Sequence, residues 1–411
     1  MVICKIWDAD YPWDVRVEKV CKSLQQKHEV HLVCRNTKCR PTYENVDGIH
    51  IHRLPFLRRN LGWFNRIIGF PAFFNPLWVF TVWRVVRRYR ATVVLARDIT
   101  LALTALLIGR WMGIPVVLDM AENYPAMIRD LWNKKFRLMN VLLRNPALVK
   151  LVEKICIRYA DHILVVVEES KQRLIELGVS PDKISVVMNT PTLERFTCSN
   201  SEASTTPMRK RKEWLSVIYL GLLEWPRGLE TAIRAIHEVR ALLPEIKLVI
   251  IGSGRDQGYF QALVQELSLT EHVAFMGWLD YREAIDHVAS ADIGLVPHHA
   301  TASWNTTIPN KLFDYMSMGK PVIVSNAIPT ERIVMEEKCG LVFREQDPKT
   351  LGEAIFKLSD QSVRESQGIR GKEAVVRRYN WTVDEERLLG AIEKAACPRP
   401  SVQTKGAESA M

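Results

Sequence analysis

The sequence lacks paired cysteines and a leader-like N-terminus. Its eight cysteines are scattered through 411 residues, and no CxxC pair or Cys/His cluster with zinc-finger spacing occurs. Scattered cysteines are typical of reduced, cytosolic thiols rather than of a disulfide framework. The N-terminal apolar run, Val2 to Trp7, is too short for a signal peptide, contains Lys5 and ends at Asp8. A secreted, disulfide-stabilised protein is therefore not expected.

The composition also excludes several classes of protein. Hydrophobic residues make up 47% and charged residues 25%, as in ordinary soluble globular chains. A disordered protein, a collagen-like fibre and a polytopic membrane protein are all excluded by these proportions. The length predicts about two or three domains. The formal net charge of +10 indicates an acidic partner, such as nucleic acid, an anionic membrane or a phosphorylated small molecule.

Acidic residues are absent from residues 51–90, which carry eight Arg and ten aromatic side chains. Basic residues beside aromatic ones are typical of a membrane interface. The uncharged part, 67–83, is interrupted by Gly and Pro, so three alternatives stay open: an interfacial or re-entrant segment, a spanning helix, or a loop and helix packed on the first domain. No recognisable nucleic-acid module is present, so the expected partner is an anionic membrane surface and not nucleic acid.

Short apolar runs alternate with helical patterns along almost the whole chain, which predicts parallel sheets covered on both faces. In the first half the expected strands are 2–7, 29–34, 92–96, 115–118, 162–166 and 184–187, with helices near 15–27, 101–112 and 136–159. In the second half they are 215–220, 246–251, 272–275, 292–296, 321–324 and 340–343. The fold class is α/β, with two Rossmann-like doubly wound domains facing one cleft.

Changes in composition suggest the domain boundaries. Residues 1–196 form the expected N-terminal, acceptor-side domain, and the Ser/Thr-rich stretch 197–213 reads as a linker. Residues 214–378 form the expected donor domain, and 379–396 a C-terminal helix that packs back on the first domain. The polar tail 397–411 is expected to be disordered.

Residues 310–321 (NKLFDYMSMGKP) form the strongest local motif, and Pro309 before it suits a helix start. A helix beginning at Asn310 offers free N–H groups to a phosphate, and Lys311 adds a full positive charge. Asp314 lies one turn further on the same face and is able to accept hydrogen bonds from ribose hydroxyls. The alternative is an amphipathic helix whose Lys and Asp are merely solvated.

Two glycine turns follow expected strands in the second half. Gly221 ends the first strand, and Arg227 opens the following helix, where its guanidinium is able to bind diphosphate oxygens. Gly252 and Gly254 follow the next strand and allow the backbone to approach a ligand closely. Either turn alone is a weak signal.

In this order, the motifs resemble the retaining GT-B glycosyltransferases of family 4, the glycosyl transferases group 1. Residues 310–321 resemble the "PNKLFEYMAxGKPV" variant of polysaccharide-assembly enzymes, and residues 11–19 (YPWDVRVEK) are similar to the family's "YPxDxRVxK". Segments 273–277 (VAFMG), 291–297 (ADIGLVP) and 113–119 (GIPVVLD) also fit, so the resemblance spans about residues 1–395. It implies a nucleotide-diphosphate sugar as donor, with Gly221, Arg227, Gly252, Gly254, Asn310, Lys311, Leu312 and Asp314 on the donor side.

The chain departs from the family pattern at several positions. The second Glu of the E-x7-E motif is Asp314, and the first falls at Thr306. The Arg of Gly-Arg-Leu is Leu222, and Lys311 is expected to replace part of its charge. These departures leave open a catalytically silent relative that binds a nucleotide sugar or a partner enzyme, and a nucleotide-sugar epimerase of the same fold.

On the acceptor side the family's His aligns with Ala121, and the nearest ionisable group is Glu122. Glu122 either orients the acceptor hydroxyl or donor sugar, or caps the following segment. Asp14 and Arg16 are the other acceptor-side candidates, and Arg16 has a structural alternative. The expected catalytic set is therefore Glu122, Arg227, Lys311 and Arg16.

No metal is expected in the reaction. Asp8-Ala9-Asp10 mimics the metal-binding DxD of another glycosyltransferase class, but we interpret it as coincidental, and the family resemblance implies metal-independent transfer. No cofactor is expected besides the donor substrate. The resemblance and the basic aromatic segment together predict transfer to a membrane-associated or lipid-linked glycan, by a peripheral or monotopic enzyme on the cytoplasmic face.

Overall fold

The protein is described by a computed structural model, and the structure describes all residues except 13, 57–68, 71–72, 133–144, 194–213 and 398–411. The expected linker and most of the expected tail lie outside the described residues, as does part of the segment 51–90. By its contacts the chain divides into two compact units. The first comprises Met1–Asp119, Ile155–Leu164 and the chain from Leu388, and the second comprises Met120–Lys154 and Val165–Arg387.

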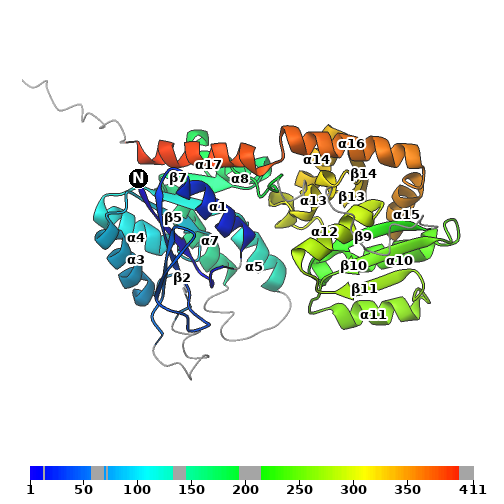
Figure 1. Ribbon diagram of the computed structural model, residues 1–411, viewed down its shortest axis with the longest axis horizontal. Helices are drawn as coiled ribbons and strands as arrows, with labels where there is room; N and C mark the ends of the chain where they lie inside the picture. Colours follow the sequence, from blue (N-terminus) through cyan, green and yellow to red (C-terminus); the bar gives the residue numbers. More distant parts are fainter. Residues whose placement is uncertain (13, 57–68, 71–72, 133–144, 194–213, 398–411) are drawn as a thin grey trace, which may run out of the picture. The chain divides into compact units, whose positions relative to one another are not determined.

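The first sheet has eight strands in the order β3-β4-β2-β1-β5-β6-β7-β8. Figure 1 labels three of them, β2, β5 and β7. The strands are β1 (Val2–Trp7), β2 (Glu29–Cys34), β3 (Tyr43–Val46), β4 (Ile49–Arg53), β5 (Val93–Arg97), β6 (Val116–Met120), β7 (His162–Val165) and β8 (Ile184–Val186). Every residue of β5, β6 and β7 is buried, as expected for parallel strands covered on both faces.

The helices of this region are α1 (Val15–Gln25), α3 (Pro76–Tyr89), α4 (Ala102–Met112), α5 (Tyr124–Trp132), α7 (Pro146–Tyr159) and α8 (Glu168–Glu176). Helix α3 begins at Pro76 because the Asn75 side chain caps it, and its buried residues include Trp78, Val82 and Val86. This part of the segment 51–90 is therefore a helix packed on the first sheet. Within the described ranges, none of the helices has the length and hydropathy that crossing a bilayer requires.

The second sheet has six parallel strands in the order β11-β10-β9-β12-β13-β14. They are β9 (Leu215–Leu220), β10 (Ile246–Ile251), β11 (Val273–Gly277), β12 (Ile293–Val296), β13 (Val322–Ser325) and β14 (Gly340–Phe343). The order has the earliest strand in the middle, which is the Rossmann arrangement. The predicted fold class of two parallel α/β sheets is confirmed.

Helices connect the strands of the second sheet or follow its last strand, β14. They are α10 (Leu229–Val239), α11 (Gln257–Glu266), α12 (Tyr281–Ser290), α13 (Lys311–Ser317), α14 (Ile328–Glu337), α15 (Pro348–Lys357), α16 (Gln361–Arg377) and α17 (Trp381–Ala396). A Rossmann sheet binds ligands outside the carboxyl ends of its strands, where the strand order reverses. Here the order reverses between β9 and β12, so a ligand is expected beside the segments that follow Leu220 and Val296.

Candidate active site

Two cations lie together after β9 and at the start of α13. Arg227 ends a short 3-10 helix (Trp225–Arg227), and its Nη1 lies 3.4 Å from His298 Nε2. Lys311 is the first residue of α13 and is only 7% exposed. His298 is buried close to both cations. Its burial, Lys311 and Arg227 all lower the pKa of its imidazole.

The ammonium group of Lys311 is the unusual feature of this cluster. Its Nζ lies 3.8 Å from the centroid of the Tyr219 ring and has no hydrogen-bond partner within the described part of the chain. Burial first, and Arg227 second, hold the pKa of Lys311 well below its ordinary value, while Asp314 opposes them. A buried cation without a hydrogen-bond acceptor is costly, so the site favours an incoming anion.

The glycines are explained by how closely the turns pack. A Cβ on Gly252 would lie 1.9 Å from the Gly221 carbonyl oxygen, and a Cβ on Gly254 would lie 2.3 Å from the Leu223 carbonyl oxygen. A Cβ on Gly221 would lie 3.0 Å from Lys311 Nζ. These residues therefore let the turns after β9 and β10 touch each other and let Lys311 reach the end of β9.

The other predicted donor-side residues differ in what their side chains do. Asp314 is nearly buried and accepts a hydrogen bond from the Tyr281 hydroxyl at 3.4 Å. Asn310 precedes α13, and its Oδ1 accepts from Asn189 Nδ2 at 2.9 Å. Leu312 is fully buried in the hydrophobic core, so its side chain packs inside the fold.

Thr306, at the position of the missing Glu, joins the Glu122 loop to the loop before α13. The Thr306 hydroxyl accepts a hydrogen bond from Asn123 Nδ2 at 3.0 Å, and Thr307 donates to the Ala121 carbonyl at 3.2 Å. Glu122 lies between these two anchors, at the carboxyl end of β6, and is half-buried. All of these residues belong to the second compact unit. Sequence positions more than 180 residues apart are thus brought together.

Asp14 and Arg16 have structural contacts within the first unit. The Asp14 carboxylate caps α1 by accepting from the Val17 amide at 2.9 Å. Arg16 is 1% exposed, and its Nη2 lies 2.7 Å from Asp119 Oδ1. Arg97 and Lys5 also face Asp119, at 3.5 and 3.8 Å. This geometry favours the structural alternative for Arg16, and a role for either residue in the reaction stays a prediction.

The Asp8-Ala9-Asp10 segment is engaged by neighbouring side chains and backbone. Asp8 accepts a hydrogen bond from the Thr100 hydroxyl at 2.8 Å, and Asp10 accepts from the Thr37 amide at 2.8 Å. Both carboxylates therefore serve the loops at the carboxyl end of β1.

Sequence reasoning missed His298 and Trp304. Trp304 stacks on His298 with ring centroids 4.1 Å apart, and Arg227 lies 4.9 Å over the Trp304 ring. His298 comes two residues after β12, at the point where the strand order reverses. Its place after a predicted strand was a signal that could have found it. Trp304 lies in a loop whose path no local pattern predicts.

The two α/β sheets, the second of them in the Rossmann strand order, are the arrangement of the GT-B fold. The "Glycosyl transferase 4-like domain" family matches residues 14–190, and the "Glycosyl transferases group 1" family matches residues 215–361. These matches cover most of the chain between them. The chain belongs to the group 1 glycosyltransferases, family 4.

Matches to curated relatives cover about half of each relative's length. A phosphatidyl-myo-inositol mannosyltransferase of Mycobacterium leprae is 25% identical over 46% of this chain and 49% of the relative. A putative colanic acid biosynthesis glycosyltransferase of Salmonella typhimurium is 25% identical over 57% of each. The chain thus spans about half the length of the curated relatives it matches.

Solved structures match over nearly the whole chain. A sucrose-phosphate synthase from Thermosynechococcus elongatus has a TM-score of 0.76 at 17% identity, covering 96% of this chain and 98% of that one. Anabaena HepE, solved in complex with UDP, has a TM-score of 0.70 at 14% identity, covering 96% and 100%. At these identities the likeness shows the fold.

Proposed function

We propose that the protein transfers a sugar from a nucleotide-diphosphate sugar to an acceptor hydroxyl, with retention of the anomeric configuration. The observation that carries the proposal is the buried ammonium of Lys311, which has no hydrogen-bond acceptor in the described structure, beside the guanidinium of Arg227. When the bond from the sugar to the diphosphate breaks, negative charge grows on the leaving phosphate. Fixed cations that meet this charge lower the barrier.

The remaining groups are assigned by their positions. We assign the ribose hydroxyls to Asp314, one turn after Lys311, because it aligns with the second Glu of the family motif. We assign Glu122, whose neighbours are bonded to Thr306 and Thr307, to orienting the acceptor or the transferred sugar. Among similar proteins, HepE has been solved with UDP-glucose, and a mannosyltransferase of Corynebacterium glutamicum is described as GDP-mannose-dependent. These names support a nucleotide-sugar donor without choosing the base.

The test of the donor site is the substitution Arg227→Ala. We expect turnover to fall at least about 100-fold, because a positively charged hydrogen-bond donor to the transition state is lost. The matched control is Arg234→Ala, on the exposed side of α10, where the guanidinium pairs with Glu230. Transfer and donor hydrolysis are measured with a panel of nucleotide sugars. A near-normal rate for Arg227→Ala would remove this residue from the site.

A catalytically silent, nucleotide-sugar-binding protein is the second candidate. The observation that favours it is Thr306, which stands where the family has a Glu and whose hydroxyl is occupied by Asn123. Binding of a nucleotide sugar with neither transfer, hydrolysis nor epimerisation would support this candidate. An epimerised product without acceptor would instead support an epimerase.

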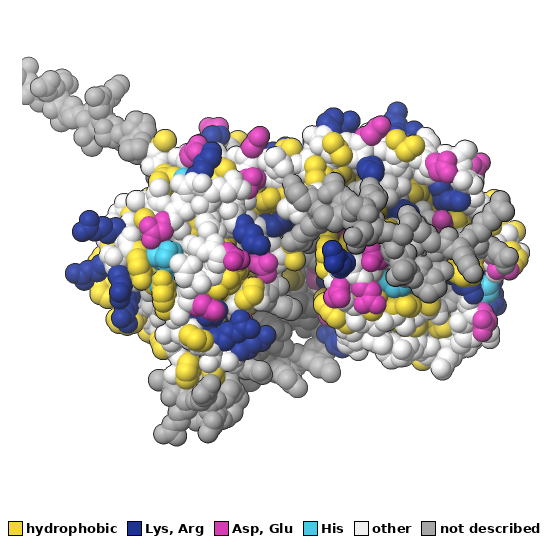
Figure 2. Space-filling view, viewed as in Figure 1, with side chains coloured by type: hydrophobic (Ala, Val, Ile, Leu, Met, Phe, Trp, Pro, Cys, Tyr) yellow, Lys and Arg dark blue, Asp and Glu magenta, His cyan; other side chains and the backbone are white. Residues whose placement is uncertain are grey.

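The proposed acceptor is a membrane-associated or lipid-linked glycan, with the enzyme a peripheral or monotopic protein on the cytoplasmic face. The support is the outer surface of α3 and α4, which we call the aromatic–basic surface: Phe80, Trp83, Arg84, Arg87 and Trp111. Trp83 and Trp111 stack at 5.9 Å between centroids, and Trp111 is 66% exposed. Figure 2 shows Lys and Arg side chains gathered beside hydrophobic ones over these helices. Arginine attracts anionic lipid, and Trp and Phe prefer the headgroup depth.

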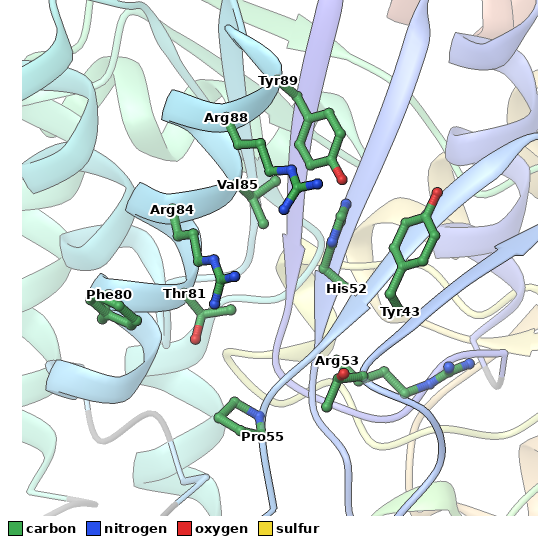
Figure 3. Close-up of a pocket in the computed structure, with 11 residues that line it drawn as sticks. Tyr43, His52, Arg53, Pro55, Phe80, Thr81, Arg84, Val85, Arg88 and Tyr89 are labelled. Atoms are coloured by element: carbon green, nitrogen blue, oxygen red, sulfur yellow. The ribbon is translucent and has the colours of Figure 1, made fainter.

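A cavity of about 530 Å³ beside this surface also supports the proposed membrane contact. Arg84 and Arg88 line one side of it from α3, and Tyr43 and His52 line the other from β3 and β4 (Figure 3). Guanidinium and phenol groups on opposite walls suit a phosphate-bearing headgroup.

Liposome co-sedimentation tests the membrane proposal. We expect Arg84→Ala, Arg87→Ala and Arg88→Ala, combined, to abolish most binding to anionic vesicles, while binding to neutral vesicles is weak for all variants. The control removes the same charge elsewhere: Arg255→Ala, Arg282→Ala and Arg370→Ala. If both triple variants bind alike, the local surface is not the membrane contact.

A further inference from the structure

Three chelating side chains from two neighbouring strands converge near the edge of the first sheet. Glu29 and His31 are two residues apart on β2, so they point to the same face. His50 on β4 pairs directly with His31 in the parallel register. One ligand atom from each of these three residues lies within 4.8 Å of the others.

The outer nitrogen of each imidazole already has a polar neighbour. His31 Nδ1 lies 2.9 Å from His52 Nε2, and His50 Nδ1 lies 2.9 Å from the Tyr43 hydroxyl. His31 Nε2 lies 2.8 Å from Glu29 Oε1. Metal-binding histidines usually have their second nitrogen hydrogen-bonded in this way, which selects the tautomer that leaves the other nitrogen to the metal. His31 Nε2 thus faces the Glu29 carboxylate, and Nε2 is the His50 nitrogen that the Tyr43 contact leaves for a ligand.

Packing holds part of this cluster rigid and leaves part open. The Tyr89 ring at the end of α3 stacks on His31 at 4.0 Å, and His31 is fully buried. The Glu29 side chain is 50% exposed, which leaves a path from solvent. The His31 and His50 rings are nearly parallel, 13° apart, so the half-buried His50 ring must rotate for both nitrogens to meet one ion.

Charge around the cluster is mixed. Arg88 approaches His52 from α3, and Figure 3 shows its guanidinium beside the imidazole, which disfavours a cation. The Glu29 carboxylate opposes this effect and is the ligand nearest to solvent. The three ligands lie in the amino half of β2 and β4, whereas Asp14 and Arg16 follow the carboxyl end of β1. The cluster therefore lies toward the opposite end of these strands from Asp14 and Arg16, the two acceptor-side candidates of the first unit.

The geometry points to a binding site for a divalent transition metal, with Zn²⁺ the ion that fits best. The ligands are the Glu29 carboxylate, His31 Nε2 and His50 Nε2, and water completes the tetrahedron. Two imidazoles and one carboxylate are a common ligand set for zinc, and nitrogen ligands disfavour Mg²⁺ and Ca²⁺. Bound metal would join β2 to β4 and stabilise this sheet edge by mass action.

Calorimetric titration of the full chain with Zn²⁺, after removal of metal by EDTA, tests the site. We expect one ion per chain at this site. Glu29→Gln and His50→Gln are each expected to weaken its binding at least tenfold, since each removes one ligand. The matched control is His287→Gln, on α12, which is expected to bind Zn²⁺ as the unchanged protein does. X-ray absorption of the zinc-loaded protein should show nitrogen and oxygen at about 2.0–2.1 Å and no sulfur at about 2.3 Å.

Three results would overturn the site: no stoichiometric binding, unchanged affinity in Glu29→Gln, or a sulfur shell from cysteine ligands. Glu29→Gln keeps the size of a partly exposed side chain, so it decides the question even if His50→Gln fails to fold. None of these measurements depends on sugar transfer, so the site stands or falls separately from the proposed function.

Discussion

At the scale of single residues, Lys311 makes donor binding depend on pH. Its pKa is lowered in the donor-free protein, mainly by burial, and a bound diphosphate would raise it. The affinity for the diphosphate that the charged Lys311 contributes is then complete below the pKa of Lys311 in the donor-free protein. It is lost as pH rises through the pKa of Lys311 in the complex. We expect binding of UDP or GDP to take up a proton in the window between the two values.

Calorimetry in two buffers of different ionisation enthalpy measures this uptake. Lys311→Met should abolish it and weaken binding, whereas Arg234→Ala should leave both unchanged. Equal proton uptake by the unchanged protein and Lys311→Met would show that another group titrates.

The positions of the candidate site residues were predictable from sequence to different degrees, and their roles stay predictions. The spacing of Lys311 and Asp314 on one short helix predicted that they share a face. The place of Arg227 after a glycine turn predicted that it lies near the end of a strand. The partners that give these residues their properties were not predictable. Tyr219 lies under Lys311, and Trp304 lies under Arg227, through contacts between distant segments.

At the scale of secondary-structure elements, Gly228 fixes the turn that presents Arg227. Its φ is +73°, and a Cβ there would lie 1.7 Å from the Pro297 carbonyl oxygen. Gly228→Ala should therefore destabilise the protein by more than about 2 kcal/mol, through backbone strain and a clash with main chain. Gly258→Ala is the matched control because it lies in α11 with open space around it. We expect that variant to be unchanged or slightly more stable in urea unfolding. Similar losses in both variants would contradict the clash.

Most strands were predicted because buried parallel strands appear as apolar runs. β1, β2, β9, β10 and β14 agree with the expected ranges, and several others differ by a residue or two. The hairpin of β3 and β4 was missed, since its residues alternate with polar ones. Its turn, Asp47-Gly48, has positive φ at both residues and was a usable signal. The register that sets His31 opposite His50 has no local signature.

At the scale of the whole molecule, one buried carboxylate makes the free energy of unfolding depend on pH in the acid range. Burial raises the pKa of Asp119, but Arg16, Arg97 and Lys5 outweigh it, and the net pKa lies well below the ordinary 3.8. A depressed pKa stabilises the fold above the ordinary value and loses that effect as pH falls. Arg16→Met should cost about 3–5 kcal/mol at pH 7 and move the loss of stability to higher pH, because the remaining cations hold the proton off less strongly.

Urea unfolding midpoints between pH 7 and pH 3 measure this effect. Arg378→Met, at an exposed pair with Glu336, serves as the control and should leave the profile unchanged. A profile for Arg16→Met that matches the control would mean that Asp119 does not depend on Arg16.

At this scale the positive charges of the chain form two groups that differ in exposure. The arginines on α3, within residues 51–90, lie beside exposed aromatic rings, whereas the cations that we propose for the donor side are Arg227 and Lys311. Salt should therefore weaken membrane binding more than it weakens binding of the nucleotide, because exposed charges are screened more than buried ones.

The first compact unit is assembled from stretches that are far apart in the sequence, with its last piece beginning at Leu388. A ribosome adds that piece only after the whole second unit has been synthesised. The first unit must then wait, incompletely covered, while the rest of the chain is made. A chain that ends before Leu388 would lack the last piece of the first unit and would expose apolar surface that this piece covers. We therefore expect late nonsense mutations to prevent folding of the first unit as early ones do.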